Sequence, residues 1–353
     1  MQVEFLIVGQ GVCGTFLSFY LRRQNRSFVV IDKNEKVTPS KMSAGVINPV
    51  TGRRLVKVWM ADTVIPFAVD AYEDLGTLLG VDGIARKHII DFFPNVHQRQ
   101  VFLERIEEGE ACLHSYPEQN DFNADFNYEL GCGEIRPAYT THLHSILPAW
   151  KKKLEEGNQI ISEDFDPAAL SMSSGSIRYR NIHAEKIIFC DGTAGITRSF
   201  FSGLPFAPNK GEALILEIPG LNRQYIYKKG FLLVPFGDEE QFWLGSNYQW
   251  EFADDQPSSE FFEQASKHAK SWIRRKFTIV GHVAAIRPAT LERRPFVGMH
   301  PVTSNVGILN GMGTKGCSLA PYFASQLVQH LICGEMIDPL ADISRFRRIL
   351  STR

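Results

Sequence analysis

The first thirty residues constrain the fold of this chain more than any other stretch. The apolar run from Phe5 to Val8 leads directly into Gly9-Gln10-Gly11-Val12-Cys13-Gly14, and a helical pattern of apolar residues follows. A second apolar run ends at Asp32, roughly 20 residues beyond the last glycine. This order of strand, glycine turn, helix, strand and acid is typical of a dinucleotide-binding βαβ unit. We therefore expect a dinucleotide site here; a ligand-free βαβ unit with a glycine-rich turn is the alternative.

Each glycine of the motif has its own physical role. Gly9 permits a tight turn, Gly11 lets the backbone approach a pyrophosphate, and Gly14 lets the helix pack closely on the strand. The free N–H groups at the helix start, around Val12 and Cys13, and the positive end of the helix dipole would face the phosphates.

The acid at the end of the second strand indicates the type of dinucleotide. Asp32 can accept hydrogen bonds from a ribose diol. The adjacent Lys33 does not exclude a contact with a 2′-phosphate, but the acid argues against NADP.

Composition bounds the class of protein. A chain of 353 residues with 44% hydrophobic and 22% charged residues is typical of a soluble enzyme with two domains. The net charge of −1 offers no broad basic field, so nucleic acid is an unlikely partner on these grounds. No apolar run is long enough to span a membrane. The six cysteines are scattered without a C-x-x-C pair, which indicates reduced thiols in a cytoplasmic protein and no metal site.

Apolar periodicity along the chain predicts an α/β protein. We expect a doubly wound, Rossmann-like domain interleaved with a second domain of β character, which we name the substrate domain. Helices are expected over residues 59–79, 137–156, 259–273 and 320–333, and Val101 to Leu103 is expected to be a strand. The dinucleotide-binding domain is assigned residues 1–80, 137–208 and 282–353, and the substrate domain residues 81–136 and 209–281.

Two further segments have the character of ligand-binding loops. The small residues Ser43, Ala44 and Gly45 would let the backbone run close to a flat or charged ligand, although an ordinary surface loop would read the same. The apolar strand from Lys186 to Cys190 ends on Asp191-Gly192. Doubly wound folds hold ligands at such strand ends, although a simple turn would look alike.

With these segments placed, the chain resembles the FAD-dependent oxidoreductases of the D-amino-acid oxidase, glycine oxidase and sarcosine oxidase superfamily over nearly its full length. The resemblance rests on the glycine motif with Asp32, on Ser43-Ala44-Gly45, on Phe165 with Lys186 to Gly192, on Ile286-Arg287-Pro288 through Gly298, and on Asn310 to Pro321. It implies FAD as the cofactor, with its isoalloxazine ring as one wall of a cavity and an antiparallel β-sheet of the substrate domain opposite.

The function that the resemblance implies is oxidation of the C–N bond of a small amine or amino acid, by hydride transfer to the N5 atom of FAD. O2 or another electron acceptor would then reoxidise the flavin, so both oxidase and dehydrogenase types are open. The residues expected to bind FAD are Gly9, Gly11, Val12, Cys13, Gly14, Asp32, Lys33, Ser43, Ala44, Gly45, Phe165, Asp191, Gly192, Gly311, Gly313, Thr314, Lys315, Gly316 and Cys317.

The resemblance also assigns residues to the chemistry. Lys315, at a helix start facing the flavin C2 carbonyl, would stabilise negative charge on the reduced ring; an exposed loop lysine is the alternative. Arg287 would clamp a substrate carboxylate bidentately, or it would instead pair with a nearby acid such as Glu292. Tyr248 is a candidate to contact substrate.

Three departures from the superfamily pattern affect the substrate. The strand from Gly230 to Phe236 lacks the tyrosine common in amino-acid oxidases, so Tyr225, Tyr227 or Tyr248 is the candidate replacement. An acid common before the second proline motif is replaced by the run Glu292-Arg293-Arg294. No cysteine lies between Arg287 and Pro295, so FAD is expected to bind non-covalently.

Two other functions remain open at this point. The lost tyrosine would fit a protein that binds FAD for a structural or partner-recognition role. An oxidase acting on a modified tRNA base would require Lys151 to Lys153 and Arg53-Arg54 to form one basic face.

Overall fold

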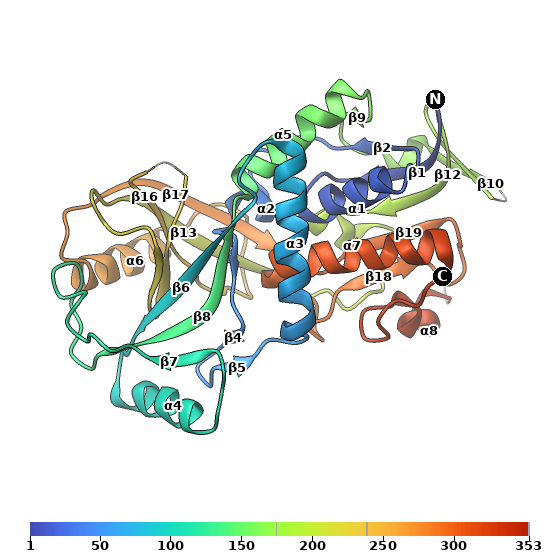
Figure 1. Cartoon of the computed structure of the whole chain (residues 1–353). Coiled ribbons are helices and arrows are strands. Elements are labelled where there is room, and N and C mark those ends of the chain that lie inside the picture. Colours follow the sequence, from blue (N-terminus) through green and yellow to red (C-terminus); the bar gives the residue numbers. More distant parts are fainter. Residues whose placement is uncertain (174, 238, 352–353) are drawn as a thin grey trace.

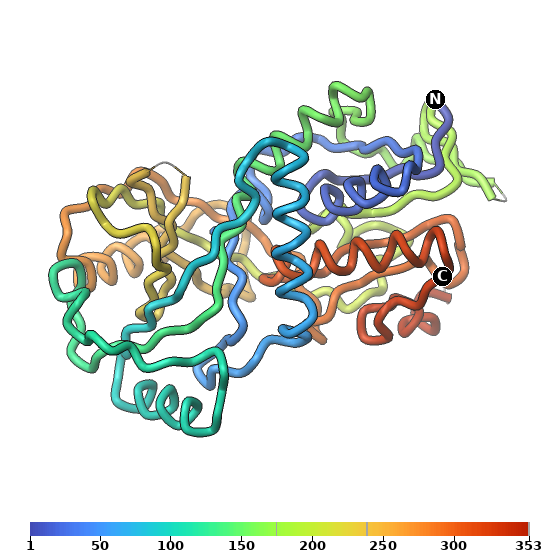
Figure 2. Tube along the Cα trace, viewed as in Figure 1, coloured from blue at the N-terminus to red at the C-terminus, as the bar shows by residue number. Residues whose placement is uncertain are grey.

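The computed structural model describes residues 1–173, 175–237 and 239–351. It contains two β-sheets that lie side by side, each with its own helices, and both ends of the chain lie in the half that holds α1 and α7 (Figure 1). The chain passes between the halves several times, as the colours along the trace show (Figure 2). The fold is therefore interleaved, as expected from the sequence.

The first sheet has the order β10-β11-β12-β1-β2-β9, and β19 pairs with β12 and β18 with β19. Strands β9, β2, β1, β12 and β19 run parallel. Their near-continuous apolar runs fit a sheet that is covered on both faces. The strands are β1 (Gln2–Val8), β2 (Phe28–Ile31), β9 (Ile160–Ile161), β10 (Leu170–Ser173), β11 (Ser176–Tyr179), β12 (Ile182–Phe189), β18 (Phe296–Met299) and β19 (Val306–Asn310).

Three helices pack on one face of this sheet, and a fourth, α3, packs against two of them, α5 and α7. Their apolar sides meet in one buried cluster in which Phe16, Tyr72, Trp150 and Phe323 are the bulky members. The buried indole N–H of Trp150 donates to Ser18 Oγ at 2.9 Å, so its one polar atom is satisfied. The helices are α1 (Val12–Arg23), α3 (Ala61–Leu79), α5 (Leu143–Glu156) and α7 (Gly316–Cys333), and the short segments η2 (Gly192–Thr197), η4 (Ile343–Phe346) and α8 (Arg347–Leu350) lie toward the opposite face.

The second sheet has the order β17-β13-β16-β15-β14-β6-β8-β3, with β7 on β8. Its pairs are antiparallel apart from β14 with β6. Its strands are β3 (Val46–Ile47), β6 (Ile84–Phe92), β7 (Leu113–Ser115), β8 (Cys132–Thr141), β13 (Asn209–Glu217), β14 (Tyr225–Lys229), β15 (Phe231–Pro235), β16 (Gln241–Gly245) and β17 (Thr278–Arg287). The remaining elements are α2 (Pro39–Met42), β4 (Val50–Thr51), β5 (Val56–Lys57), α4 (Val96–Glu107), η1 (Pro167–Ala169), α6 (Ser259–Trp272) and η3 (Gly313–Lys315).

Two of the expected elements are wrong. Residues 137–141 are the end of strand β8, because the β-favouring run Tyr139-Thr140-Thr141 pairs with β6 and β3, and helix α5 begins only at Leu143. Val101 to Leu103 lie inside helix α4, whose start is capped by Asn95.

Two of the expected domain boundaries, at residues 137 and 282, fall inside strands β8 and β17. Local periodicity indicates that a segment is a strand, but it does not indicate which of the two sheets the strand joins. The division into domains therefore stays a prediction.

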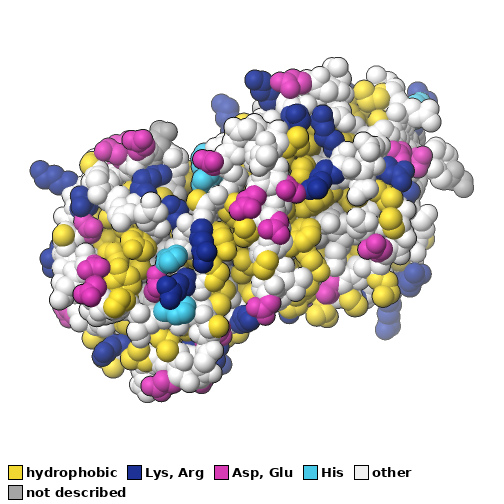
Figure 3. All heavy atoms as spheres, viewed as in Figure 1, with side chains coloured by type: hydrophobic (Ala, Val, Ile, Leu, Met, Phe, Trp, Pro, Cys, Tyr) yellow, Lys and Arg dark blue, Asp and Glu magenta, His cyan; other side chains and the backbone are white. Residues whose placement is uncertain are grey.

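Surface charge is mixed. Acidic and basic side chains are interspersed on the face shown in Figure 3.

None of the helices in the described part of the chain combines the length and apolar character that a membrane crossing demands.

Candidate active site

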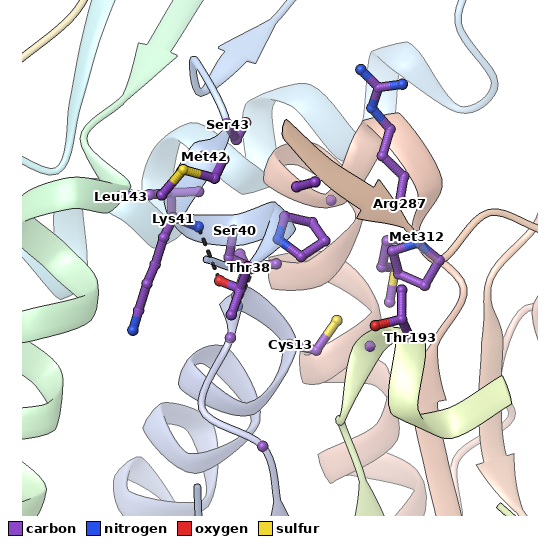
Figure 4. A pocket seen from close by; sticks show the side chains of 18 of the residues that line it. Cys13, Thr38, Ser40, Lys41, Met42, Ser43, Leu143, Thr193, Arg287 and Met312 are labelled. Carbon is purple, nitrogen blue, oxygen red and sulfur yellow. Dashed lines mark hydrogen bonds between the residues drawn. The ribbon is translucent and has the colours of Figure 1, made fainter. Parts of the chain in front are cut away.

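A cavity of about 360 Å³ lies between the two sheets. The glycine-rich loop after β1, the segment from Thr38 to Asn48 and the start of α7 form one side, and strands β13, β15, β16 and β17 contribute the other. Every residue expected at the site lines this cavity except Gly14 and Gly311. In Figure 4, α2 with Thr38, Ser40 and Lys41 lies across the cavity from Thr193, Met312 and Arg287.

Gly14 and Gly311 shape the site through the backbone. A Cβ on Gly14 would lie 1.9 Å from the carbonyl oxygen of Gly9, so only glycine lets α1 approach this strand end. Gly311 has a φ of +77°, and a Cβ there would lie 2.7 Å from Thr290 Cγ2. These two glycines therefore set the path of the chain without lining the cavity.

The carboxylate of Asp32 ties the glycine loop to the end of β2. It accepts hydrogen bonds from the backbone N–H groups of Gln10 and Asn34, both at 2.7 Å. Phe165 lies at the same end of the cavity and stacks on Tyr179 with ring centroids 4.9 Å apart. This end offers an acid that suits a ribose diol, while the Phe165 ring, 6% exposed, is packed against Tyr179 and Arg198.

The start of α1 provides the backbone donors for a phosphate. Val12 N donates to Ser40 Oγ at 3.1 Å, and a Cβ on Gly11 would lie 3.1 Å from the same oxygen. Both observations place Ser40 directly over the helix start. Sequence reasoning missed Ser40, although the capping pattern Thr38-Pro39 before it marks the start of α2.

Lys315 lies at the opposite end of the cavity. Its Nζ donates to Asn48 Oδ1 at 2.9 Å, and it makes no ion pair with an acid in the described residues. Burial lowers the pKa of the Lys315 amine to about 8. The alternative of an exposed loop lysine is therefore wrong. Sequence reasoning missed Asn48 as the partner of Lys315.

We expect Lys315→Met to stabilise the apoprotein. A lysine with a folded-state pKa near 8, below its ordinary value of 10.5, opposes folding below pH 8, and the penalty fades between pH 8 and 10.5. The variant should gain up to about 3 kcal/mol in the free energy of unfolding at pH 7, and little at pH 10.5. Urea unfolding at both pH values measures this; an equal gain at both would contradict the lowered pKa.

Arg287 ends strand β17 with a guanidinium bound only to neutral groups. It donates to Asn209 Oδ1 at 2.7 Å, to Ser246 Oγ at 2.7 Å and to the carbonyl of Asn247 at 3.2 Å. Burial lowers the pKa of this group from its ordinary value. Glu292, the acid considered as its partner, pairs with Arg345 instead at 3.3 Å.

The guanidinium also lies against an aromatic ring. Its carbon is 4.9 Å from the centroid of the Tyr248 ring, which is 58% exposed at the edge of the cavity. Tyr225 and Tyr227 pack with Phe122 on the second sheet and do not line the cavity. Tyr248 is thus the one of the three candidate tyrosines that reaches the site.

A buried ion pair supports the wall after β12. Arg198 Nε lies 2.7 Å from Asp191 Oδ2, with 15% and 6% of these side chains exposed. The other oxygen, Asp191 Oδ1, is buried without a hydrogen-bond partner, and burial raises the pKa of this carboxyl despite the arginine. The Arg198 guanidinium also lies 5.0 Å from the Phe165 ring centroid.

Arg198→Met should destabilise the apoprotein by about 3 kcal/mol, because it leaves the Asp191 charge buried without a partner. Arg178→Met, which removes an exposed arginine from strand β11, is the matched control and should change stability by less than about 0.5 kcal/mol. Chemical denaturation measures both. Equal stability of the two variants would show that the pair contributes nothing.

The two basic segments considered for a tRNA substrate lie apart. The β4–β5 hairpin with Arg53-Arg54 lies near the first residue of α3, whereas α5, which carries Lys151 to Lys153, crosses near its last turn (Figure 1). The two segments therefore lie toward opposite ends of α3.

Comparison with known proteins identifies the family of this chain. The family model "FAD dependent oxidoreductase" matches residues 4–330. Glycine oxidase from Pseudomonas putida is 24% identical over 96% of this chain and 97% of its own. Solved structures with the same fold include iminodiacetate oxidase from Chelativorans sp. BNC1 (TM-score 0.77, 16% identity, 95% and 96% covered) and glycine oxidase from Geobacillus kaustophilus (TM-score 0.76, 18% identity, 95% and 96% covered).

The chain belongs to the FAD-dependent oxidoreductase family of the D-amino-acid oxidase type. It is an enzyme of the amine or amino-acid oxidase or dehydrogenase type, with FAD as its cofactor. The residues present fit that group, because the cavity joins an acid at the end of β2, the side-chain-free backbone of Gly11 at the start of α1 and a cation at the start of α7.

Proposed function

We propose that this enzyme oxidises the C–N bond of a small amine that carries a carboxylate. The observation that carries the proposal is Arg287, a guanidinium in the cavity wall whose partners in the described residues are all neutral. A half-buried cation whose protein partners are all neutral favours an anionic ligand. The matched glycine oxidase and iminodiacetate oxidase are named for carboxylate-bearing amines, which agrees.

Arg287 would bind the substrate carboxylate through the planar fork of its guanidinium and hold the α-carbon in one orientation. Bound FAD would supply the oxidising centre and accept a hydride at N5. Lys315, with its proton held at Nζ, would place positive charge beside the developing negative charge. The apolar residues of strands β13, β15 and β17 would exclude water.

The second-sheet wall of the cavity supplies no free carboxylate to act as a base among the described residues. Glu212 borders it, but the Glu212 carboxylate accepts from Ser258 N at 2.6 Å and Ser258 Oγ at 2.8 Å, and His282 Nε2 lies 3.1 Å away. The amine would therefore arrive neutral, and the rate should rise with pH as the free amine deprotonates.

A matched pair of substrates tests the proposal. N-methylglycine and dimethylamine share the same secondary amine and differ by the carboxylate. We expect turnover of N-methylglycine, with aldehyde formation, at a rate at least about 100-fold above that of dimethylamine. Equal turnover of both would remove the role given to the carboxylate. Measuring with O2 and then with an artificial acceptor distinguishes an oxidase from a dehydrogenase.

FAD is proposed to bind without a covalent link, because no cysteine lies between Arg287 and Pro295. Denaturation followed by filtration should release all of the flavin.

The unpaired thiols Cys13, Cys112, Cys132, Cys190, Cys317 and Cys333 fit the reducing cytoplasm, which we propose as the location.

A further inference from the structure

Two glycines on neighbouring strands leave the cavity face of the second sheet bare, and a side chain from elsewhere on the sheet lies over each. Gly211 of β13 lies under the Arg287 guanidinium, since a Cβ there would be 1.7 Å from Nη2. Gly245 of β16 lies under the outer edge of the Trp243 indole, since a Cβ there would be 2.9 Å from Cη2. Ala213 pairs with Gly245 and lies on the same face as Gly211, two residues along β13.

This arrangement fixes the space between the guanidinium and the indole. Gly211 and Gly245 are diagonal neighbours across two antiparallel strands, a relation that places residues about 7–8 Å apart. A carboxylate oxygen hydrogen-bonded to Arg287 takes about 2.8 Å of that span. About 4–5 Å then separates this oxygen from the indole, little more than one van der Waals contact of about 3.5–4.0 Å, so a group that extends from the carboxylate toward the indole has little room. The buried methyl of Ala213 is the floor of this short slot.

The indole is fixed in place. Trp243 is 8% exposed, and its Nε1 donates to the carbonyl oxygen of Met42 at 3.1 Å. This bond ties the ring to α2, the element that also brings Ser40 to the start of α1. A ring anchored to both sides of the cavity cannot swing away without breaking this part-buried hydrogen bond.

We propose that Trp243 is the specificity-determining residue of the site: its indole closes the slot opposite Arg287 and restricts substrates to those with little or no side chain on the α-carbon. Glycine and N-substituted glycines fit the slot, whereas an unbranched side chain of two or more carbons meets the indole. This inference rests on the proposed carboxylate-binding role of Arg287.

Binding of straight-chain acids tests it without turnover. The FAD-loaded enzyme is titrated with acetate, propionate, butyrate and valerate, and the change in flavin absorbance reports binding. The wild type should bind acetate or propionate at least about 10-fold more tightly than butyrate and valerate. In Trp243→Phe, the affinity for butyrate and valerate should rise by a similar factor relative to the affinity for acetate and propionate. Trp250→Phe, an exposed tryptophan outside the cavity, should keep the wild-type cut-off.

Ala213→Val should make the slot smaller, whereas Trp243→Phe should make it larger. The Ala213 variant keeps the inference testable if the Trp243 variant does not fold. An added methyl pair on the floor should weaken propionate at least about 10-fold more than acetate. An unchanged cut-off in both variants, or equal binding of all four acids by the wild type, would overturn the role of Trp243 and leave Arg287 in place. Failure of the wild type to bind any acid would overturn the carboxylate site and this inference with it.

Discussion

Replacing Arg287 with alanine is expected to lower kcat/KM for a carboxylate-bearing amine by about 10³-fold, through loss of two charge-assisted hydrogen bonds to the substrate. FAD should remain bound, because the hydrogen bonds and ring contact of the Arg287 guanidinium within the described residues go to β13 and to the segment after β16, where they involve Asn209, Ser246, Asn247 and Tyr248. Steady-state kinetics and the flavin absorbance of the purified variant measure the two quantities separately.

Two controls make this result specific. Arg287→Lys keeps the charge but loses the planar fork, so it should recover only part of the activity. The residual rate with an amine lacking a carboxylate should be the same in wild type and Arg287→Ala. Unchanged kcat/KM for N-methylglycine in Arg287→Ala would end the clamp assignment.

Gly11→Val is expected to abolish FAD binding, with an increase in Kd of at least about 10³-fold. A Cβ at this position would already lie 3.1 Å from Ser40 Oγ, and the two valine methyl groups would extend into the space in front of the α1 N–H groups. A pyrophosphate would then lose its close approach to the backbone and to the helix dipole. Flavin absorbance after desalting and reconstitution measures the occupancy.

The fold of the variant needs a separate check. Gly11 has φ −72° and ψ −166°, a conformation open to any residue, so apo Gly11→Val should unfold at the temperature of the wild-type apoprotein. Gly11→Ala should bind FAD with an intermediate affinity, because the Ser40 hydroxyl can rotate away from one methyl group. A Gly11→Val protein fully loaded with FAD would contradict the phosphate assignment.

The doubly wound fold and a dinucleotide site could be predicted from local signals in the sequence, whereas FAD as the dinucleotide was predicted from the family resemblance. The glycine motif, the apolar strands around it and Asp32 lie within one βαβ unit, where spacing alone determines which groups meet. The path of β8 could not be predicted in this way. Its residues 137–141 are strand because they pair with β6 and β3, and that pairing joins segments far apart in the sequence.

The same distinction between local and long-range signals applies to the residues of the site. Arg287 and Lys315 were recognised through the family resemblance, but their partners were not. Asn48 lies 267 residues from Lys315, and Asn209 lies 78 residues from Arg287, so neither contact leaves a local pattern. Trp243 also carried no signal, because an apolar residue in a strand looks the same whether it faces a core or a cavity.

The central claim is that this protein oxidises carboxylate-bearing amines with FAD, and one spectrum tests it most directly. The FAD-loaded protein is mixed anaerobically with glycine, N-methylglycine or iminodiacetate, and the visible absorbance of the oxidised flavin is followed. We expect the absorbance to bleach with at least one of these compounds and to return when an electron acceptor is admitted. A flavin that dithionite bleaches, but that none of these or other amino acids and secondary amines reduces, would contradict the claim.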